Sequence, residues 1–211
     1  MQINMTTFGG RKHHYINETL QSLFVSDWRD ANMPVNLILG SEDDSHVREY
    51  AAHPSIRIVP WDAVTNANLR LNCTLNKIRA LRCGEDDATL ICEDDISFLP
   101  TWLEPLKLAV AELGDEQYIL SLFAARQDLE RANLVNGKSW VKGYPTSYLC
   151  GAQALFYPSR TIRNRVADYL TENLKRGCGD HLIGRYARSY AILYSTKEIL
   201  VDHIGAISSF H

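Results

Sequence analysis

Three carboxylates in a row, Glu93-Asp94-Asp95, directly follow an apolar run at residues 88–92 and precede the apolar Ile96. Carboxylates this close repel one another, and a divalent cation is the simplest compensation for that repulsion. In an extended segment, Glu93 and Asp95 point to one side and Asp94 points to the other. The sequence therefore predicts an oxygen-rich site for Mn²⁺ or Mg²⁺ after this run, with the carboxylates of Glu93 and Asp95 on one side.

Two further acidic triples differ from this one in position. Glu42-Asp43-Asp44 follows a predicted strand and Gly40-Ser41, which makes it a rival metal site, although it is better placed to hydrogen-bond a ribose or a base. Glu85-Asp86-Asp87 precedes the apolar run instead, so we expect it at the opposite edge of the sheet, in a polar turn with Gly84.

The elements that must position these acids alternate between strand and helix, which predicts an α/β fold with a mainly parallel sheet. Ligands of such sheets bind beyond the carboxyl ends of the strands, so the residues after each strand are the first candidates. We predict strands at residues 2–7, 35–39, 56–59, 88–92, 118–124, 149–157, 190–194 and 199–201. We predict helices at residues 15–29, 66–83, 101–113, 160–175 and 180–188.

The predicted helix at residues 66–83 has an apolar face and a polar stripe. Leu71, Leu75 and Ile78 recur at helical spacing, which predicts that they face the core. The neighbouring stripe is polar and available to a ligand; it comprises Asn68, Asn72, Asn76 and Arg79.

Composition places the chain among ordinary globular proteins. The 211 residues (23.9 kDa) suit one domain, and 45% hydrophobic residues exclude a disordered chain, a collagen and a coiled coil. The net charge of −3 disfavours a nucleic-acid partner bound by charge, although a modified-base acceptor stays possible. The sequence has no transmembrane run, no signal peptide and no CxxC pair among its five cysteines, so we expect a cytoplasmic, reduced protein.

The order of elements resembles GT-A-type glycosyltransferases, in which a D-x-D-type metal motif follows the fourth strand. ICEDDISF at residues 91–98 looks like that motif, with Glu in place of its first Asp. This leaves open whether Glu93 meets metal or ribose. The segment GCGD at residues 177–180, which ends in Asp180 and leads into a predicted helix, resembles the place of the catalytic base in inverting members. VDHIGAISS at residues 201–209 resembles a segment whose His, here His203, reaches the metal or diphosphate.

This resemblance implies a single domain over residues 1–211, with a nucleotide-sugar-binding half at 1–100 and an acceptor-binding and catalytic half at 101–211. It implies metal-dependent transfer of a hexosyl or N-acetylhexosaminyl group from a nucleotide sugar, with UDP favoured, to a glycan or another hydroxyl acceptor. Its metal ligands would be Glu93, Asp95 and His203, and its inverting base Asp180, for which a helix N-cap is the alternative. Its donor contacts would be Thr6, Thr7, Phe8, Arg11, Asp43, Asn72, Asn76, Arg79 and Asp94.

The polar segment at residues 126–148 is the predicted acceptor site, because aromatic faces stack on sugar rings. Its candidates are Trp140 and Tyr144, and the alternative is a surface loop pinned by its aromatics. Arg11 begins a basic cluster with Lys12, His13 and His14, which suits either a diphosphate or a solvated helix start.

Two other classes of protein compete with this interpretation. A sugar-nucleotide nucleotidyltransferase shares the layout and the metal dependence, but it leaves Asp180 and His203 unexplained. A non-catalytic sugar- or nucleotide-binding module requires no base. A Rossmann dehydrogenase and an α/β-hydrolase are disfavoured, because the chain has neither G-x-G-x-x-G nor G-x-S-x-G.

Overall fold

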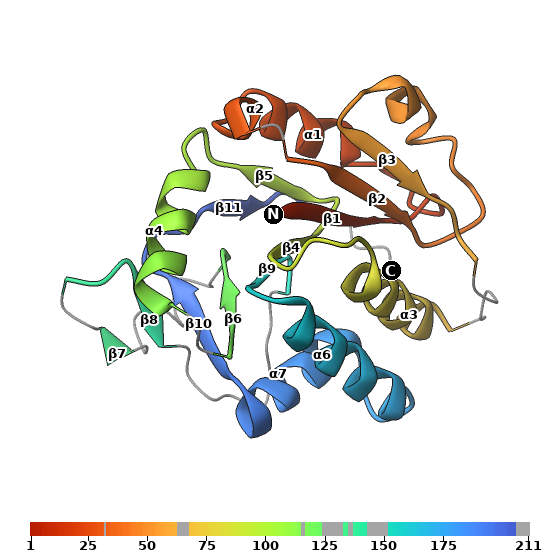
Figure 1. Cartoon of the computed structure of the whole chain (residues 1–211). Helices are drawn as coiled ribbons and strands as arrows, with labels where there is room; N and C mark the ends of the chain where they lie inside the picture. Colours follow the sequence, from red (N-terminus) through yellow and green to blue (C-terminus); the bar gives the residue numbers. More distant parts are fainter. Residues whose placement is uncertain are drawn as a thin grey trace.

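A nine-stranded mixed sheet forms the centre of the part of the chain described by this computed structural model, residues 1–31, 33–62, 68–114, 117–123, 133–134, 137–142 and 152–205. The strand order is β3-β2-β1-β4-β9-β6-β10-β8-β7 (Figure 1). The strands are β1 (Gln2–Thr7), β2 (Val35–Leu39), β3 (Ile56–Val59), β4 (Thr89–Glu93), β6 (Tyr118–Ser121), β7 (Asn133–Leu134), β8 (Trp140–Lys142), β9 (Ala154–Tyr157) and β10 (Ile192–Thr196).

The first half of the sheet is parallel and the second half is mixed. Strands β3, β2, β1 and β4 run parallel to one another, whereas β9 is antiparallel to both of its neighbours, β4 and β6. The predicted α/β fold is therefore confirmed. A separate two-stranded antiparallel sheet joins β5 (Ile96–Phe98) to β11 (Val201–His203).

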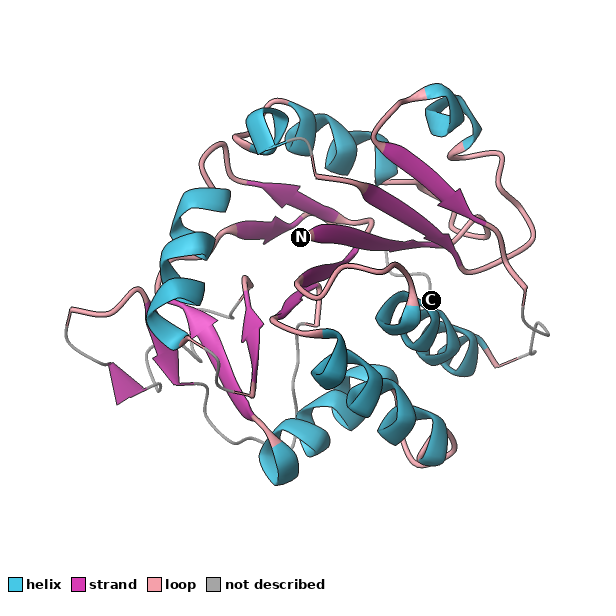
Figure 2. Cartoon of the chain, viewed as in Figure 1, coloured by secondary structure: helices cyan, strands magenta, loops and turns pink. Residues whose placement is uncertain are grey.

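Helices cover both faces of the sheet (Figure 2). Alternation along each strand divides the apolar side chains into two clusters: Leu90 and Cys92 of β4 face one cluster and Ile91 faces the other. The first cluster includes residues of α1 (Ile16–Phe24), α2 (Trp28–Ala31) and α4 (Leu103–Leu113). The second includes residues of α3 (Leu69–Arg82), α6 (Arg160–Glu172) and α7 (Gly179–Tyr190). A short 3₁₀ helix spans Arg48–Ala52.

The predicted helix at 15–29 is wrong in one respect, because it is two helices. Ser26 lies at the break, where its hydroxyl donates to the Leu23 carbonyl at 2.7 Å and accepts from the Trp28 amide at 3.2 Å. The indole Nε1 of the buried Trp102 also donates to Ser26 Oγ, at 3.0 Å. These bonds satisfy the groups freed at the break and tie it to the start of α4.

The predicted apolar face of α3 is buried at Ile78 but not at its other two positions. Leu71 and Leu75 are only half-buried, whereas Asn72 and Asn76 of the polar stripe are buried. The stripe lies against the sheet because backbone carbonyls there need donors: Asn76 Nδ2 donates to the Ile38 carbonyl at 3.2 Å. Asn68 is the N-cap of this helix, since its side chain accepts from the amides of residues 70 and 71.

The turn between α3 and β4 lies at the sheet edge opposite to the carboxyl ends of β1, β2 and β4. Gly84 adopts a φ of 80°, which favours glycine, and the neighbouring Glu85 pairs with Arg160. The prediction of a polar turn at Glu85-Asp86-Asp87 is thus confirmed. No helix of the described residues is long and apolar enough to cross a bilayer.

Arg163 of α6 is completely buried and closes that turn. Its Nη1 donates to the carbonyls of Leu81 at 2.8 Å and Cys83 at 3.0 Å, and its Nη2 donates to the Asp86 carbonyl at 2.5 Å. The guanidinium thereby takes the place of the missing intrahelical partners at the C-terminus of α3.

We predict that Arg163→Met lowers the free energy of unfolding by about 2–4 kcal/mol, because buried carbonyls lose their donors. Urea unfolding of the purified variant measures this loss. Arg165→Met is the matched control, since Arg165 is exposed on the same helix and donates to Gln117 Oε1 at 2.7 Å rather than to a backbone carbonyl of the turn. An equal loss in both variants would contradict the capping role.

Candidate functional site

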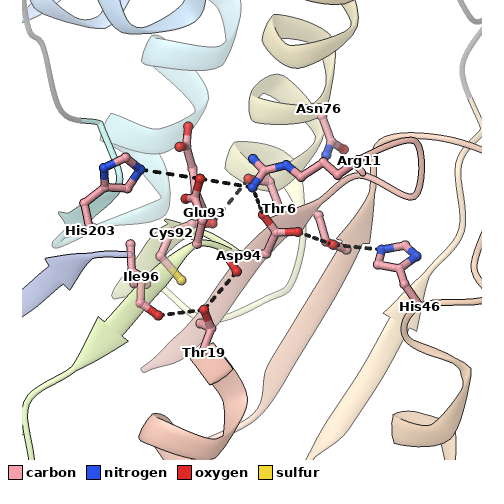
Figure 3. Close-up of polar contacts among 12 residues, drawn as sticks. Thr6, Arg11, Thr19, His46, Asn76, Cys92, Glu93, Asp94, Ile96 and His203 are labelled. Carbon is pink, nitrogen blue, oxygen red and sulfur yellow. Dashed lines mark hydrogen bonds and ion pairs between the residues drawn. The ribbon is translucent and has the colours of Figure 1, made fainter. Parts of the chain in front are cut away.

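The carboxyl ends of β1, β2 and β4 meet at one edge of the sheet. Thr6 of β1 lies opposite Glu93 of β4, and Thr7 lies opposite Leu39 of β2. The triple Glu93-Asp94-Asp95 therefore lies beside the end of the first strand, where ligands of parallel sheets bind. Thr19 of α1 fixes the backbone that follows, with its Oγ1 2.8 Å from the Asp94 carbonyl and 2.6 Å from that of Ile96 (Figure 3).

The small sheet β5–β11 brings His203 to the acids. His203 lies opposite Ile96 in the pairing, and the Ile204 amide donates to the Asp95 carbonyl at 2.9 Å. His203 Nε2 is 3.5 Å from Asp95 Oδ2. A side chain at Gly205 would collide with both groups, because its Cβ would lie 2.5 Å from Asp95 Oδ2 and 2.8 Å from His203 Nε2. The HIG sequence thus suits this close approach.

Arg11 supplies a guanidinium to the same acids. Its Nη1 lies 3.1 Å from Asp94 Oδ1 and 3.0 Å from Asp95 Oδ2. Arg11 comes from the turn after β1, where its amide donates to the Phe8 carbonyl at 3.4 Å. Figure 3 shows Arg11, Asp94 and His203 gathered above the end of β4. Arg11 therefore lies beside Asp94 and Asp95, and its contact with a donor stays a prediction.

Asp94 is buried and points away from His203, toward β1. Thr7 Oγ1 donates to Asp94 Oδ2 at 2.5 Å and lies 2.8 Å from His46 Nε2. Because the single hydroxyl proton goes to the carboxylate, His46 Nε2 is the donor to Thr7. Burial raises the pKa of the Asp94 carboxyl to about 6, against the opposing effect of Arg11.

A second charged group, missed by sequence reasoning, contains Glu93. Lys77 Nζ of α3 lies 2.9 Å from Glu93 Oε1 and 2.5 Å from Asp180 Oδ1. Burial alone lowers the pKa of this ammonium, but Asp180 and Glu93 raise it well above its usual value. The signal in the sequence was weak, because a single lysine in a helix normally indicates a solvated face.

Asp180 is the second residue of α7, whose N-cap is Cys178. The alternative that Asp180 caps this helix is therefore wrong. Its carboxylate lies in the first turn, where the helix dipole favours negative charge, and its side chain is 31% exposed. A carboxylate that is held at one oxygen and partly open to solvent is chemically suited to take a proton from a bound hydroxyl.

The predicted metal ligands form a pair and a separate residue. Asp95 and His203 are adjacent, whereas Glu93 is occupied by Lys77. No three His, Cys, Asp or Glu side chains in the described ranges converge on a common metal position. Asp95 Oδ1 is nevertheless buried without a hydrogen-bond partner among the described residues. One carboxylate and one imidazole fit Mn²⁺ as a two-residue site whose other ligands come from a bound substrate.

Three residues predicted to contact the donor form part of the scaffold. Asn72 is buried, and Asn76 bonds to the β2 backbone. Arg79 Nε donates to Asp62 Oδ1 at 2.7 Å, and its Nη1 donates to the Leu39 carbonyl at 2.5 Å. The same guanidinium lies 5.0 Å from the Trp61 ring centroid. The arginine thus links the ends of β2 and β3, because their terminal carbonyls need donors.

The remaining predicted donor contacts lie around the same strand ends. Thr6 Oγ1 donates to the Cys92 carbonyl at 3.3 Å. The Phe8 ring lies close to Gly10 and Gly40, where added Cβ atoms would meet it at 2.7 and 3.4 Å. Asp43 is exposed, and its Oδ1 accepts from the Ser45 amide at 3.0 Å. Hydrogen bonding to the Ser45 side chain and to this amide lowers the pKa of the Asp43 carboxyl.

Trp140, the predicted acceptor residue that the structure describes, does not lie beside the acids. Trp140 lies on β8, four strands from β4, and its half-buried ring packs edge-on against Tyr194 with centroids 4.7 Å apart. The structure gives Trp140 a packing role. Tyr144 lies outside the described residues, as do Tyr148 and residues 206–209 of the VDHIGAISS segment.

No protein-family model and no curated protein sequence matches the chain. Solved structures do resemble it. TarS of S. aureus superposes over 93% of this chain and 60% of its own, with 12% identity and a TM-score of 0.57. GalNAc-T7, solved with UDP, GalNAc and Mn²⁺, matches 96% of this chain and 42% of its own, with 11% identity and a TM-score of 0.63.

A mannosyltransferase from Pyrobaculum calidifontis, solved with GDP-Man and Mn²⁺, matches the whole chain and 58% of its own, with 16% identity and a TM-score of 0.63. The chain therefore has the GT-A fold of glycosyltransferases, as its sequence predicts. It spans about half the length of these three structures.

The hydroxyl of Thr7 joins His46 to Asp94, so its removal tests the organisation of the site. We predict that Thr7→Val lowers the free energy of unfolding by about 1–3 kcal/mol, because two buried polar atoms lose their partner. Urea unfolding measures the effect. Thr171→Val is the control, since that exposed threonine makes a local bond to the Ala167 carbonyl. A stability unchanged from wild type would show that water replaces the hydroxyl.

Proposed function

We propose that this protein is a metal-dependent glycosyltransferase that moves a sugar from a nucleoside-diphosphate donor to a hydroxyl acceptor, with inversion. The observation that carries the proposal is the meeting of Asp95, His203 and Arg11 at the strand ends, with Asp180 presented from a different element. The GT-A fold supports it, since structural neighbours hold UDP or GDP-Man together with Mn²⁺.

Asp95 and His203 would hold the divalent cation. The described charges favour one, because the carboxylates of Glu93, Asp94, Asp95 and Asp180 outnumber the two cations that touch them by two. When bound, the cation supplies Lewis-acid stabilisation of the departing diphosphate. Arg11 contributes a fixed positive charge at the same place, which favours binding of the phosphates.

Asp180 would act as the base. Inverting transfer needs a carboxylate that takes the proton of the acceptor hydroxyl while the acceptor oxygen attacks the anomeric carbon. The partial exposure of Asp180 leaves it open to an acceptor. The N-terminal half at 1–100 would then bind the nucleotide through Thr6, Thr7, Phe8 and Asp43, and the half at 101–211 would provide the acceptor side.

A nucleotide-binding module without catalysis is the second candidate, and the same donor site would serve it. It predicts nucleotide binding without turnover, whereas the transferase predicts release of nucleoside diphosphate. A nucleotidyltransferase would instead release pyrophosphate from a nucleoside triphosphate and a sugar phosphate. Product analysis separates the three.

The first test is a panel of donors incubated with and without Mn²⁺. We expect slow Mn²⁺-dependent hydrolysis of at least one among UDP-glucose, UDP-galactose, UDP-N-acetylglucosamine, UDP-N-acetylgalactosamine and GDP-mannose, with water as acceptor. Coupled detection of UDP or GDP measures it, and calorimetry with UDP and GDP measures binding. If neither nucleotide binds and none is released under any condition, the transferase proposal fails.

Two substitutions separate the metal role from the base role. Asp95→Asn should weaken Mn²⁺-dependent nucleotide binding by at least about tenfold, because the cation loses a charged ligand. Asp180→Asn should leave nucleotide binding unchanged and lower kcat by about 10²–10⁴-fold. Asp168→Asn is the control, because Asp168 is an exposed α6 residue paired with Arg82. Undiminished turnover by Asp180→Asn would remove Asp180 as the base.

A further inference from the structure

A buried ammonium joins the candidate base to the donor side of the site. Lys77 Nζ contacts Glu93 at the end of β4 and Asp180 at the start of α7, at 2.9 and 2.5 Å. The two acids belong to elements 87 positions apart in the sequence, so the lysine is a direct physical link between them. The acids are more exposed than the lysine, with 26% and 31% of their side chains accessible against 11%. The carboxylates therefore face the ligand edge, and the ammonium lies behind them.

The aliphatic part of the Lys77 side chain, called its stem here, is also fixed by packing. It passes so close to Gly179 that a Cβ there would lie 2.9 Å from Lys77 Cδ. Any larger residue at the first position of α7 would push the stem away. Glycine at this position thus permits α3 and α7 to approach each other at the site.

The surroundings of the ammonium make its charge important to both acids. Glu93 from β4, Asp180 from α7, Tyr157 from β9 and Cys73 from α3 all interact electrostatically with Lys77. Arg11 is the other cation that acts on Cys73 in this group. Two carboxylates at this depth repel each other, and the ammonium offsets that repulsion while fixing which oxygen of each carboxylate points inward.

We propose that Lys77 is a positioning residue for the transfer reaction: it holds Asp180 by Oδ1, so that Oδ2 faces the acceptor, and couples that geometry to Glu93 on the donor side. This inference rests on the proposed function. In the step it serves, the acceptor hydroxyl proton passes to Asp180 Oδ2 and the acceptor oxygen bonds to the anomeric carbon. The bond from that carbon to the β-phosphate oxygen breaks, and its electron pair leaves with the nucleoside diphosphate.

The test compares Lys77→Met with wild type in hydrolysis of the best donor of the UDP- and GDP-sugar panel, with Mn²⁺ and water as acceptor. We expect kcat to fall by about tenfold or more through loss of orientation, while the donor KM and the UDP or GDP affinity change by less than about twofold. The acidic limb of the kcat–pH profile should move up by about one pH unit, because a carboxylate without its adjacent cation holds a proton more tightly. A merely structural lysine would not shift that limb.

Arg82→Met is the matched control for loss of an interhelical ion pair on the same helix. Arg82 Nη2 lies 3.0 Å from Asp168 Oδ1 on α6, and both side chains are exposed. We expect its kcat, KM and pH profile to equal those of wild type.

Gly179→Ala is the second variant, and it keeps the test decisive if Lys77→Met does not fold. It leaves every charge in place and displaces only the lysine stem. We expect the same fall in kcat with unchanged nucleotide affinity. Folded variants that retain wild-type kcat and pH profile overturn the role of Lys77, while the wild-type activity leaves the proposed function intact. A wild-type protein that binds nucleotide without turnover overturns both.

Discussion

Repulsion among carboxylates at one edge of the sheet is the constraint on which the rest of the site depends. Glu93, Asp94 and Asp95 leave the end of β4 together, and Asp180 joins them from α7. Each is drawn away from bulk water to some degree, so their mutual repulsion is weakly screened. The fold offsets it with two cations from different elements, Arg11 after β1 and Lys77 within α3. Each cation contacts two acids, which divides the cluster into a pair at Arg11 and a pair at Lys77.

This division explains why distant parts of the chain converge on the site. Arg11 can reach Asp94 and Asp95 because β1 and β4 are parallel neighbours whose ends coincide. Lys77 reaches Asp180 because α3 and α7 pack on the same face of the sheet, with Gly179 permitting the approach. His203 reaches Asp95 only through the pairing of β5 with β11. The scaffold contacts of Asn76 and Arg79 keep the ends of β2 and β3 in register with this edge.

The sequence predicted the place of the acids but not the manner of their compensation. A continuous apolar run followed by charges locates a strand end, and this rule needs no tertiary information. Lys77 and the burial of Asn72 and Asn76 depend on which face of α3 meets the sheet. Local periodicity placed Ile78 correctly in the core, but it missed the two asparagines because the sheet edge presents carbonyls that need donors. The three-residue strands β5 and β11 are too short for a pattern to establish, so the contact between His203 and Asp95 was foreseen from the family resemblance alone.

The two pairs differ in which carboxylate oxygens lack a partner, and this difference decides where a metal ion could bind. Lys77 is buried and holds one oxygen of each carboxylate in its pair, whereas the pair at Arg11 retains Asp95 Oδ1, which has no hydrogen-bond partner in the described part of the chain. In the proposed function, the cation would therefore bind at Asp95 and its neighbour His203, rather than at Glu93. With two protein ligands, a Mn²⁺ ion would still need several oxygen ligands, and a nucleoside diphosphate carries them. The negative charge of the diphosphate would in turn be offset by Arg11, so metal and diphosphate would each complete the coordination or charge that the other lacks.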